Sequence, residues 1–372
     1  MKLSVLKENQ KNETRVALAP SSVKDLIKFG FEVFIQIDAG LSSGYTNKEY
    51  EDFGAKIVDR EECLNNKTIC LVVRLPNIKD ISKISKNTIL IGILDPYENK
   101  ESLTQLKDFQ ITSITMELIP RISRAQNMDV LSSQANLAGY RAVIDAANLF
   151  GKAFPMMMTA AGRINPAKVM VLGVGVAGLQ AIATAKRLGA VVSATDVRLA
   201  TKEQVESLGA KFIMVEEVDD AETSSGYAKE MTKDYQEKQS KLISETIKKQ
   251  DIVICTAQIP GKKAPILINE EMVNSMSQGS IVVDLAVETG GNCTVSKLNE
   301  IIVHNGIKII GHSNVPGKVA KDASNLYSKN LVNFISLLID KKEKKINIDW
   351  EDEIVKSVIL THNGNITLEK FK

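Results

Sequence analysis

The stretch from Lys168 to Arg198 constrains the fold of this chain more than any other part of the sequence. Strand-forming residues up to Leu172 run into the segment GVGVAG, residues 173–178; a helical stretch follows, and then a second strand that ends at Asp196. In such a unit the first glycine permits a tight turn, the second lets the backbone approach a pyrophosphate, and the third lets the helix pack close to the sheet. The pattern predicts a dinucleotide-binding β-α-β unit. A glycine-rich turn that only joins a strand to a helix is the alternative, and it leaves Asp196 unexplained.

The acidic residue at the end of the second strand indicates which dinucleotide is bound. A carboxylate at Asp196 can accept hydrogen bonds from the adenosine ribose and repel a 2′-phosphate, which favours NAD(H) over NADP(H). Arg198 argues the other way, because an arginine just past this strand can accommodate a 2′-phosphate. A solvated loop charge is the other interpretation of Arg198.

Composition and length exclude several classes of protein. The 372 residues are enough for two domains, and 44% hydrophobic with 25% charged residues is ordinary for a globular protein. A net charge of +2 gives no general argument for nucleic acid. The cysteines lack C-x-x-C spacing, so we expect free buried thiols and no metal site.

No apolar run approaches the roughly 18 residues of a membrane span, and the N-terminus lacks a signal-peptide core. We therefore expect no direct membrane insertion: the chain is either cytosolic or attached to a membrane only through partners.

Strand and helix signals alternate over the first part of the chain, which predicts a parallel sheet with helical crossovers. The expected strands are Leu3–Leu6, Glu32–Ile37, Ile69–Val73, Thr88–Leu94 and Ile111–Met116, and the expected helices are Ser21–Phe29, Asn47–Phe53 and Ser102–Phe109.

Two long apolar-periodic helices, Ser133–Phe150 and Asp322–Ile339, enclose the dinucleotide unit. Between them we expect further strands at Lys211–Val215, Asp251–Thr256, Ser280–Leu285 and Ile307–Ile310. The predicted fold is α/β, with two Rossmann-like doubly wound parallel-sheet domains joined by two long helices. Residues 1–135 with 325–372 would form the first domain and residues 136–324 the NAD(H)-binding domain, with a ligand cleft between them.

Two charged segments stand apart from this pattern. Asp219–Lys249 should begin as a mobile surface loop and end as a helix. Tyr227, just after Gly226, either packs on this loop or has a role in binding. The basic run Lys341–Lys345 is expected to be a solvated helix end and turn.

With these residues laid out, the chain resembles the NAD(H)-binding subunits (domain I) of proton-translocating NAD(P) transhydrogenases, a family that is itself similar to alanine dehydrogenase. The resemblance covers essentially the whole chain. Its most specific matches are Lys7–Ala17, Pro120–Ser133, residues 173–178 with Ala194–Arg198, Ser225–Ala228, Ile259–Lys262 and Thr289–Cys293.

The resemblance implies that the nicotinamide end of NAD(H) is held by Arg121, Gln126, Asp129, Ser132 and Ser133. A spacing of three would place Gln126, Asp129 and Ser132 on one helix face, where an amide, a carboxylate and a hydroxyl can hold a ribose and a carboxamide. Helix capping by Asp129 with Ser132 or Ser133 is the alternative. Arg121 could likewise be a solvated charge.

The resemblance also assigns the rest of the cofactor site. Tyr227 belongs to a loop that closes over the nucleotide, and with Arg121, Gln126, Asp129 and Ser132 it completes the expected catalytic set. Gln258 stands where many relatives carry an aliphatic residue. The residues expected along the adenosine and pyrophosphate are Gly173, Val174, Gly175, Val176, Gly178, Asp196, Val197, Arg198, Gly226, Tyr227, Thr256, Ala257 and Gln258.

The positions of the histidines separate two chemistries. Oxidation of an amino acid moves a proton as well as a hydride and needs an acid–base group, most often His. All three histidines lie in the last quarter of this chain, and Asp95 and Glu288 stand near the positions where alanine dehydrogenases carry a His and an Asp. Hydride transfer between two nicotinamides needs no such group, only positioning and the exclusion of water.

The expected function is therefore that of the NAD(H)-binding transhydrogenase subunit. It would form a homodimer, docked at the cytoplasmic face on separate chains that bind NADP(H) and span the membrane. A stand-alone alanine dehydrogenase-like enzyme and a non-catalytic NAD(H)-sensing module are the alternatives.

Overall fold

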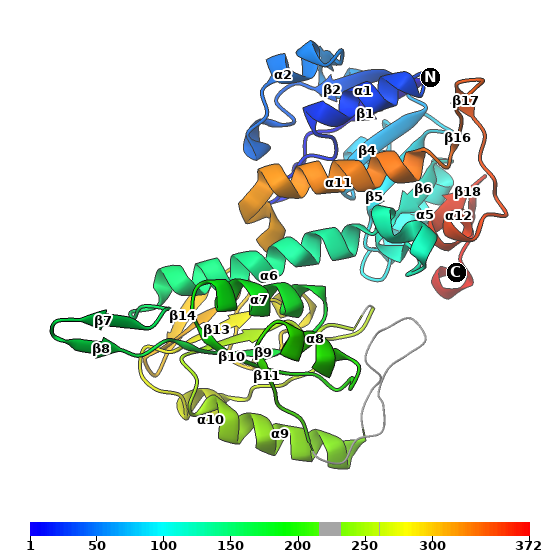
Figure 1. Cartoon of the computed structure of the whole chain (residues 1–372). Helices are drawn as coiled ribbons and strands as arrows, with labels where there is room; N and C mark the ends of the chain where they lie inside the picture. Colours follow the sequence, from blue (N-terminus) through cyan, green and yellow to red (C-terminus); the bar gives the residue numbers. More distant parts are fainter. Residues whose placement is uncertain (216–231, 260) are drawn as a thin grey trace. The chain divides into compact units, whose positions relative to one another are not determined.

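The computed structural model describes residues 1–215, 232–259 and 261–372. The chain forms two compact units, one of Met1–Gln134 with Gly317–Lys372 and one of Ala135–Pro316 (Figure 1). It leaves the first unit within the long helix α6 (Val130–Leu149) and returns through the 3-10 helix η5 (Val315–Val319).

The first unit is built on an eight-stranded sheet in the order β19-β18-β6-β5-β4-β1-β2-β3. The strands from β6 to β3 are parallel, and β18 and β19 add an antiparallel edge. Successive strands extend to opposite sides of β1 and β4, so the sheet is doubly wound with its switch point between these two. The strands are β1 (Lys2–Val5), β2 (Glu32–Gln36), β3 (Lys56–Val58), β4 (Ile69–Arg74), β5 (Ile89–Ile93), β6 (Thr112–Thr115), β18 (Ile359–His362) and β19 (Asn365–Ile366).

Helices cover both faces of this sheet, because side chains alternate between the faces along each strand. In β4, Leu71 packs in the core that includes residues of α1 and α11, whereas Val72 packs in the core that includes residues of α3 and α5. The helices are α1 (Pro20–Lys28), α2 (Asn47–Asp52), α3 (Arg60–Leu64), α4 (Ile78–Ile81), α5 (Lys100–Asp108), α11 (Ala320–Ile335) and α12 (Glu353–Val358), with 3-10 turns η1 (Leu41–Ser43), η2 (Met116–Leu118), η3 (Ser123–Met128) and η6 (Glu369–Phe371).

The segment after α11 differs from the prediction. The helix ends at Ile335, and Ile339 pairs with Ile346 in a hairpin of β16 (Ile339–Asp340) and β17 (Lys345–Ile346). The basic run is the exposed turn of this hairpin, so the expected turn is confirmed and the expected helix end is wrong. Ile339 is buried in the apolar core of the first unit, and a strand allows this burial while the lysines stay in solvent.

The second unit is built on a seven-stranded sheet in the order β11-β10-β9-β12-β13-β15-β14. All its neighbouring strands are parallel except β14 against β15. The switch point lies between β9 and β12, so this unit is also doubly wound and both units have the predicted fold class. The strands are β9 (Lys168–Leu172), β10 (Val191–Thr195), β11 (Lys211–Phe212), β12 (Ile252–Cys255), β13 (Ile281–Asp284), β14 (Ile301–His304) and β15 (Ile307–Ile310).

Helix α6 passes very close to the start of α7 in the second unit. A Cβ atom added at Gly139 would lie 2.0 Å from the carbonyl oxygen of Ala177, so only glycine fits at this crossing. The helices of this unit are α7 (Val176–Arg187), α8 (Thr201–Ser207), α9 (Lys233–Ile247) and α10 (Glu270–Asn274), with the 3-10 turn η4 (Val287–Thr289).

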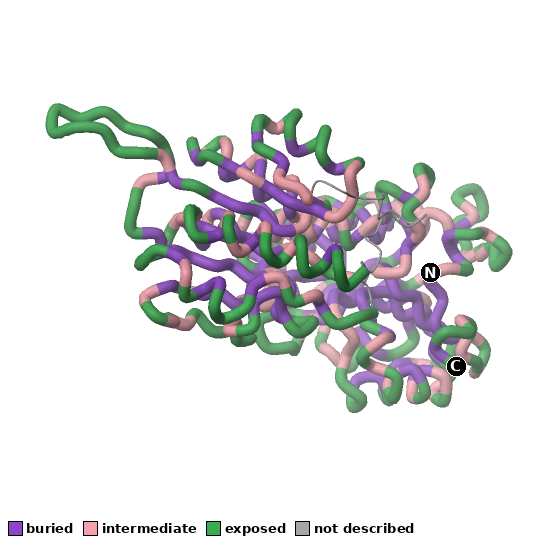
Figure 2. The backbone as a smooth tube through the Cα atoms, turned by 90° about the horizontal axis from the view of Figure 1, so that it is seen from below, coloured by how far each residue is buried: buried purple, intermediate pink, exposed green. Residues whose placement is uncertain are grey.

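An antiparallel hairpin of β7 (Met157–Thr159) and β8 (Gly162–Ile164) extends from the second unit and is exposed along both strands (Figure 2). Its sequence has no alternation of apolar and polar residues, so the pattern gave no signal for these two strands.

Candidate functional site

The glycine-rich turn between β9 and α7 has the geometry that its sequence predicts. Gly173 has a φ of +92°, and a Cβ atom there would lie 3.0 Å from the Ala257 nitrogen. A Cβ atom at Gly178 would lie 2.0 Å from the carbonyl oxygen of Gly173. At Gly175, by contrast, a Cβ atom would meet no atom of the described residues within 4 Å. The first and third glycines are therefore required by packing, whereas the second faces open space.

The N-terminus of α7 is free to bind an anion. Gly175 is its N-cap residue and supplies no side-chain hydrogen bond to the first turn. The first N–H groups of a helix have no intrahelical acceptors, and the helix dipole makes this end attractive to phosphate. Open space at Gly175 and an uncapped helix together suit a pyrophosphate.

Asp196 lies at the end of β10 with both carboxylate oxygens already bonded. Oδ2 accepts from the Val174 backbone at 2.6 Å and from Arg198 Nη2 at 2.8 Å. Oδ1 accepts from the Arg198 backbone and from Arg198 Nε, both at 2.9 Å. The Asp196 side chain is 5% exposed and that of Arg198 14%. Arg198 is thus a partner of Asp196 and not a solvated charge, and it bonds the oxygens that a ribose would use.

The loop after β12 closes against the glycine-rich turn. Thr256 Oγ1 donates to the carbonyl oxygen of Gly173 at 2.8 Å. Ala257 is held on both sides by the Asn292 side chain, and Gln258 Nε2 donates to the carbonyl oxygen of Leu285 at 3.0 Å. Within the second unit, the structure therefore brings together the fingerprint, Asp196 with Val197 and Arg198, and Thr256–Gln258.

The residues expected at the nicotinamide end lie in the first unit, from just before η3 to the first turn of α6. Arg121 and Gln126 are exposed, and the Gln126 side chain makes no hydrogen bond with the described residues. Asn330 of α11 donates to the carbonyl oxygen of Asn127 at 2.8 Å, and Ser133 Oγ donates to Asn330 Oδ1 at 2.8 Å. Helix α11 thereby fixes the position of this segment.

One geometric expectation about this segment is wrong. Gln126 lies in η3 and α6 begins only at Val130, so Gln126, Asp129 and Ser132 do not share a helix face. Asp129 instead caps α6: Oδ1 accepts from the Ser132 backbone at 2.9 Å, and Oδ2 accepts from Ser132 Oγ at 2.5 Å. The capping interpretation agrees with the structure, because the Asp129 carboxylate accepts a hydrogen bond from an N–H group in the first turn that has no intrahelical acceptor. Gly226 and Tyr227 lie outside the described residues.

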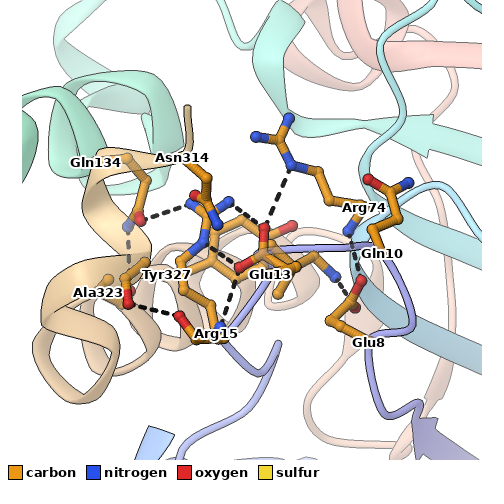
Figure 3. Close-up of polar contacts among 12 residues, drawn as sticks. Glu8, Gln10, Glu13, Arg15, Arg74, Gln134, Asn314, Ala323 and Tyr327 are labelled. Carbon is orange, nitrogen blue, oxygen red and sulfur yellow. Dashed lines mark hydrogen bonds and ion pairs between the residues drawn. The ribbon is translucent and has the colours of Figure 1, made fainter. Parts of the chain in front are cut away.

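A buried polar network in the first unit was not assigned any role from the sequence (Figure 3). Arg15 donates to Glu13 through Nε at 2.8 Å and Nη2 at 2.7 Å, and to Gln134 Oε1 through Nη1 at 2.9 Å. Arg74 Nε lies 3.4 Å from Glu13 Oε2. The two arginines are held by one carboxylate, so the pKa of Glu13 falls to about 2 despite burial, which acts in the opposite direction.

Glu8 extends this network at the switch point between β1 and β4. It accepts from the backbone N–H groups of Val73 at 2.6 Å and Arg74 at 3.2 Å. Burial outweighs these bonds and raises the pKa of Glu8 to about 7. A cavity of about 430 Å³ lies beside it, lined by the residues that follow β1 and β4.

The candidate acid–base residues Asp95 and Glu288 are both exposed. Glu117 accepts the Asp95 backbone N–H at 2.5 Å, and Glu288 accepts that of Asn314 at 3.1 Å. His362 packs against Trp350 at a ring separation of 4.0 Å, and burial lowers its pKa. Across the described residues, no His, Cys, Asp or Glu groups suit a metal ion. None of the helices in those same residues is both long and apolar enough to cross a membrane.

Comparisons with known proteins match the chain along its whole length. The family models "Alanine dehydrogenase/PNT, N-terminal domain" and "Alanine dehydrogenase/PNT, C-terminal domain" match residues 4–138 and 142–369. An NAD(P) transhydrogenase subunit alpha chain of Rhodospirillum rubrum is 50% identical, over 98% of this chain and 97% of the relative. Alanine dehydrogenase of Bacillus subtilis is 27% identical, over 99% of this chain and 93% of the relative. The structure of transhydrogenase from Sinorhizobium meliloti superposes with a TM-score of 0.87 at 46% identity, covering 100% of both chains.

Proposed function

Because this chain belongs to the alanine dehydrogenase/PNT family and is much closer to a transhydrogenase alpha subunit than to an alanine dehydrogenase, we propose that it is the NAD(H)-binding subunit of a proton-translocating NAD(P) transhydrogenase. It transfers hydride between its own NAD(H) and NADP(H) bound on a partner subunit. NADH becomes NAD⁺ as NADP⁺ becomes NADPH, and no proton is exchanged at either ring.

The glycine-rich turn carries this proposal. Its two packed glycines, its open Gly175 and the uncapped helix α7 provide a place for the pyrophosphate. Asp196 stands at the end of the neighbouring strand β10, where the adenosine ribose binds in this fold. Because the Arg198 guanidinium bonds both oxygens of Asp196, it leaves the carboxylate when the ribose hydroxyls arrive.

Positioning residues supply the rest of the proposed site. Arg121, Gln126, Asp129, Ser132 and Ser133 hold the nicotinamide, its carboxamide and its ribose. Exposure of Arg121 and Gln126 supports this role, since both side chains can reach a ligand. Hydride transfer depends on the placement of two rings and on a dry site, which amide, hydroxyl and guanidinium groups provide without acid–base chemistry. Tyr227 acts as the lid over the bound nucleotide.

The partners complete the reaction. We propose that two copies of the chain form a dimer and dock on chains that bind NADP(H) and span the membrane, at its cytoplasmic face. The name of the Rhodospirillum rubrum relative, a subunit, supports the need for partner chains. Separate chains then perform the proton translocation.

A stand-alone alanine dehydrogenase is the second candidate, favoured only by the shared fold and family. It needs an acid–base group, and the positions where the family offers one carry Asp95 and Glu288. The Glu288 carboxylate accepts the Asn314 N–H, and the backbone N–H of Asp95 donates to Glu117. An NAD(H)-sensing module without chemistry would bind the nucleotide equally well.

One experiment distinguishes these three functions. The purified chain is titrated with NADH by calorimetry and assayed with alanine and pyruvate. It is then mixed with a partner domain carrying an NADP⁺ analogue whose reduction absorbs at a distinct wavelength. We expect NADH binding, no turnover of alanine or pyruvate, and hydride transfer in the mixture. Turnover of alanine at ordinary dehydrogenase rates would overturn the proposal, and binding without transfer would favour the sensing module.

A further inference from the structure

The segment Thr289–Cys293 turns sharply back onto the end of β13 in the second unit. Gly290 and Gly291 have φ angles of +103° and +80°, which L side chains rarely adopt. A Cβ atom at Gly291 would lie 2.8 Å from Asp284 Oδ2. The turn brings the Asn292 backbone N–H to 3.0 Å from that oxygen, so Asp284, itself fully buried, fixes where Asn292 stands.

Asn292 is fully buried and all polar atoms of its side chain are bonded. Its Nδ2 donates to the carbonyl oxygens of Ala257 at 2.9 Å and Pro265 at 2.8 Å, and its Oδ1 accepts the Ala257 N–H at 3.1 Å. One amide thus holds both backbone polar groups of Ala257. No other residue type offers a donor and an acceptor in this planar arrangement at this size, apart from the longer glutamine.

Ala257 in turn adjoins the glycine-rich turn. The Ala257 nitrogen and Thr256 Oγ1 are each 3.0 Å from the place of a Cβ atom at Gly173, and Thr256 Oγ1 donates to the Gly173 carbonyl oxygen at 2.8 Å. The contacts therefore run without interruption from Asp284 through Asn292, Ala257 and Thr256 to Gly173.

We propose that Asn292 is a positioning residue of the nucleotide site, which sets the place of the pyrophosphate-binding turn through Ala257 and Thr256. The inference rests on the proposed function, because it takes the turn to be where NAD(H) binds. Asn292 touches no nucleotide itself. Its effect should fall on the pyrophosphate, since the Asp196 carboxylate, which would hold the ribose, stands at the end of β10 and accepts none of its printed hydrogen bonds from Ala257.

The test replaces the amide by an isosteric carboxyl, Asn292→Asp, and the hydroxyl by a methyl group, Thr256→Val. The introduced carboxylate faces two carbonyl oxygens and repels the Ala257 carbonyl. We expect both variants to weaken NADH and ADP on the order of tenfold, the effect of losing about one positioned hydrogen bond. Adenosine, which lacks the pyrophosphate, should be affected less than about twofold. Thr256→Ser keeps the hydroxyl and should restore NADH affinity.

A pH profile separates positioning from general loss of stability. In Asn292→Asp, NADH affinity should recover as the pH is lowered from 8 to 5, because a protonated carboxyl can again donate to the Ala257 carbonyl. The matched control is Ile309→Val, a fully buried change in β15 of the same unit. It lowers stability but should leave NADH affinity and its pH profile unchanged.

The outcomes identify which idea fails. If the wild-type chain did not bind NADH, the proposed function would fail. If the wild type bound NADH and Thr256→Val kept wild-type affinity for NADH and ADP, the inference about Asn292 would be wrong, whether or not Asn292→Asp folds. Equal weakening of adenosine and ADP would also overturn it, since that would indicate a general disturbance of the site.

Discussion

Removal of the Arg198 guanidinium should make this chain bind NADH more tightly. Two of the four donors on the Asp196 carboxylate come from that guanidinium, at 2.9 and 2.8 Å. The other two are backbone N–H groups and stay in place. An adenosine ribose offers two hydroxyl groups, so it can bind Asp196 only by displacing the guanidinium. Arg198→Met keeps an unbranched apolar side chain and removes both competing donors.

The burial of the pair sets the expected magnitude. The side chains of Asp196 and Arg198 are 5% and 14% exposed. The pair therefore lies between two reference cases. Surface ion pairs contribute about 0–1 kcal/mol, and loss of one partner from a fully buried pair costs about 3–5 kcal/mol. Opening the pair should thus cost about 1–2 kcal/mol in the wild type. Without that cost, NADH should bind about 5- to 30-fold more tightly.

Calorimetric titration with NADH and NADPH, at one ionic strength, measures this effect. The matched control is Arg187→Met, which removes the same charge at an exposed position at the end of α7. It should leave both affinities unchanged. Urea unfolding should show Arg198→Met less stable than the wild type without ligand, because Asp196 has lost its counter-charge. Weaker NADH binding by Arg198→Met would refute the reasoning, and would mean that Arg198 binds the nucleotide itself.

Three further predictions concern other parts of the chain. Gly175→Ala should fold with an unchanged melting temperature yet weaken NADH binding at least about tenfold. Gly178→Ala should unfold at a lower temperature, since its Cβ atom would lie 2.0 Å from the Gly173 oxygen. Similar effects of both variants on stability would contradict the assigned roles. The Glu8 pKa of about 7 lies above its ordinary value of 4.5, so the folded chain keeps a proton that the unfolded chain releases. The free energy of unfolding should fall by up to about 3 kcal/mol as pH rises from 4.5 to 7, measured by urea unfolding, and Glu8→Gln should remove this slope. Gln126→Asn should slow hydride transfer in stopped-flow mixing more than it weakens NADH binding, and a loss confined to binding would assign it no part in ring position.

The nucleotide-binding turn could be predicted from the sequence because its rules are local. Each glycine has a steric reason that depends on atoms close by: Gly178 on the oxygen of Gly173, and Gly173 on its own positive φ. Strands and helices alternate with a clear period, so most elements of both sheets were also predictable within a few residues. The fold class follows from that alternation.

The start of α6 shows why local signals can fail. Asp129, Ser132 and Ser133 are all residues that favour a helix N-cap, and the sequence does not say which of them acts as one. The structure has Asp129 outside the helix, and the predicted common face with Gln126 disappears as a result. The residue at which a helix begins therefore decides which side chains share a face and can bind a ligand together.

Contacts between distant residues could not be predicted at all. Arg15 meets Gln134, and Asn292 meets Ala257, across 119 and 35 residues of the chain. Spacing in the sequence carries no information about such pairs. The Gly290–Gly291 pair was the one available signal, because two adjacent glycines often mark a turn with positive φ angles. What that turn holds became clear only from the structure.

Asp196 and Asn292 together explain how the glycine-rich turn keeps its shape. Asp196 holds the Val174 N–H at one side of the glycine-rich turn, and Asn292 holds Ala257 at the other. With both sides of the turn fixed before binding, little of the binding energy of NAD(H) is lost to ordering the loop. Arg198 is the exception, because its guanidinium must move. The Asp196 carboxylate therefore has two partners, the Arg198 guanidinium and the ribose hydroxyls of the nucleotide. These two partners compete for the same oxygens.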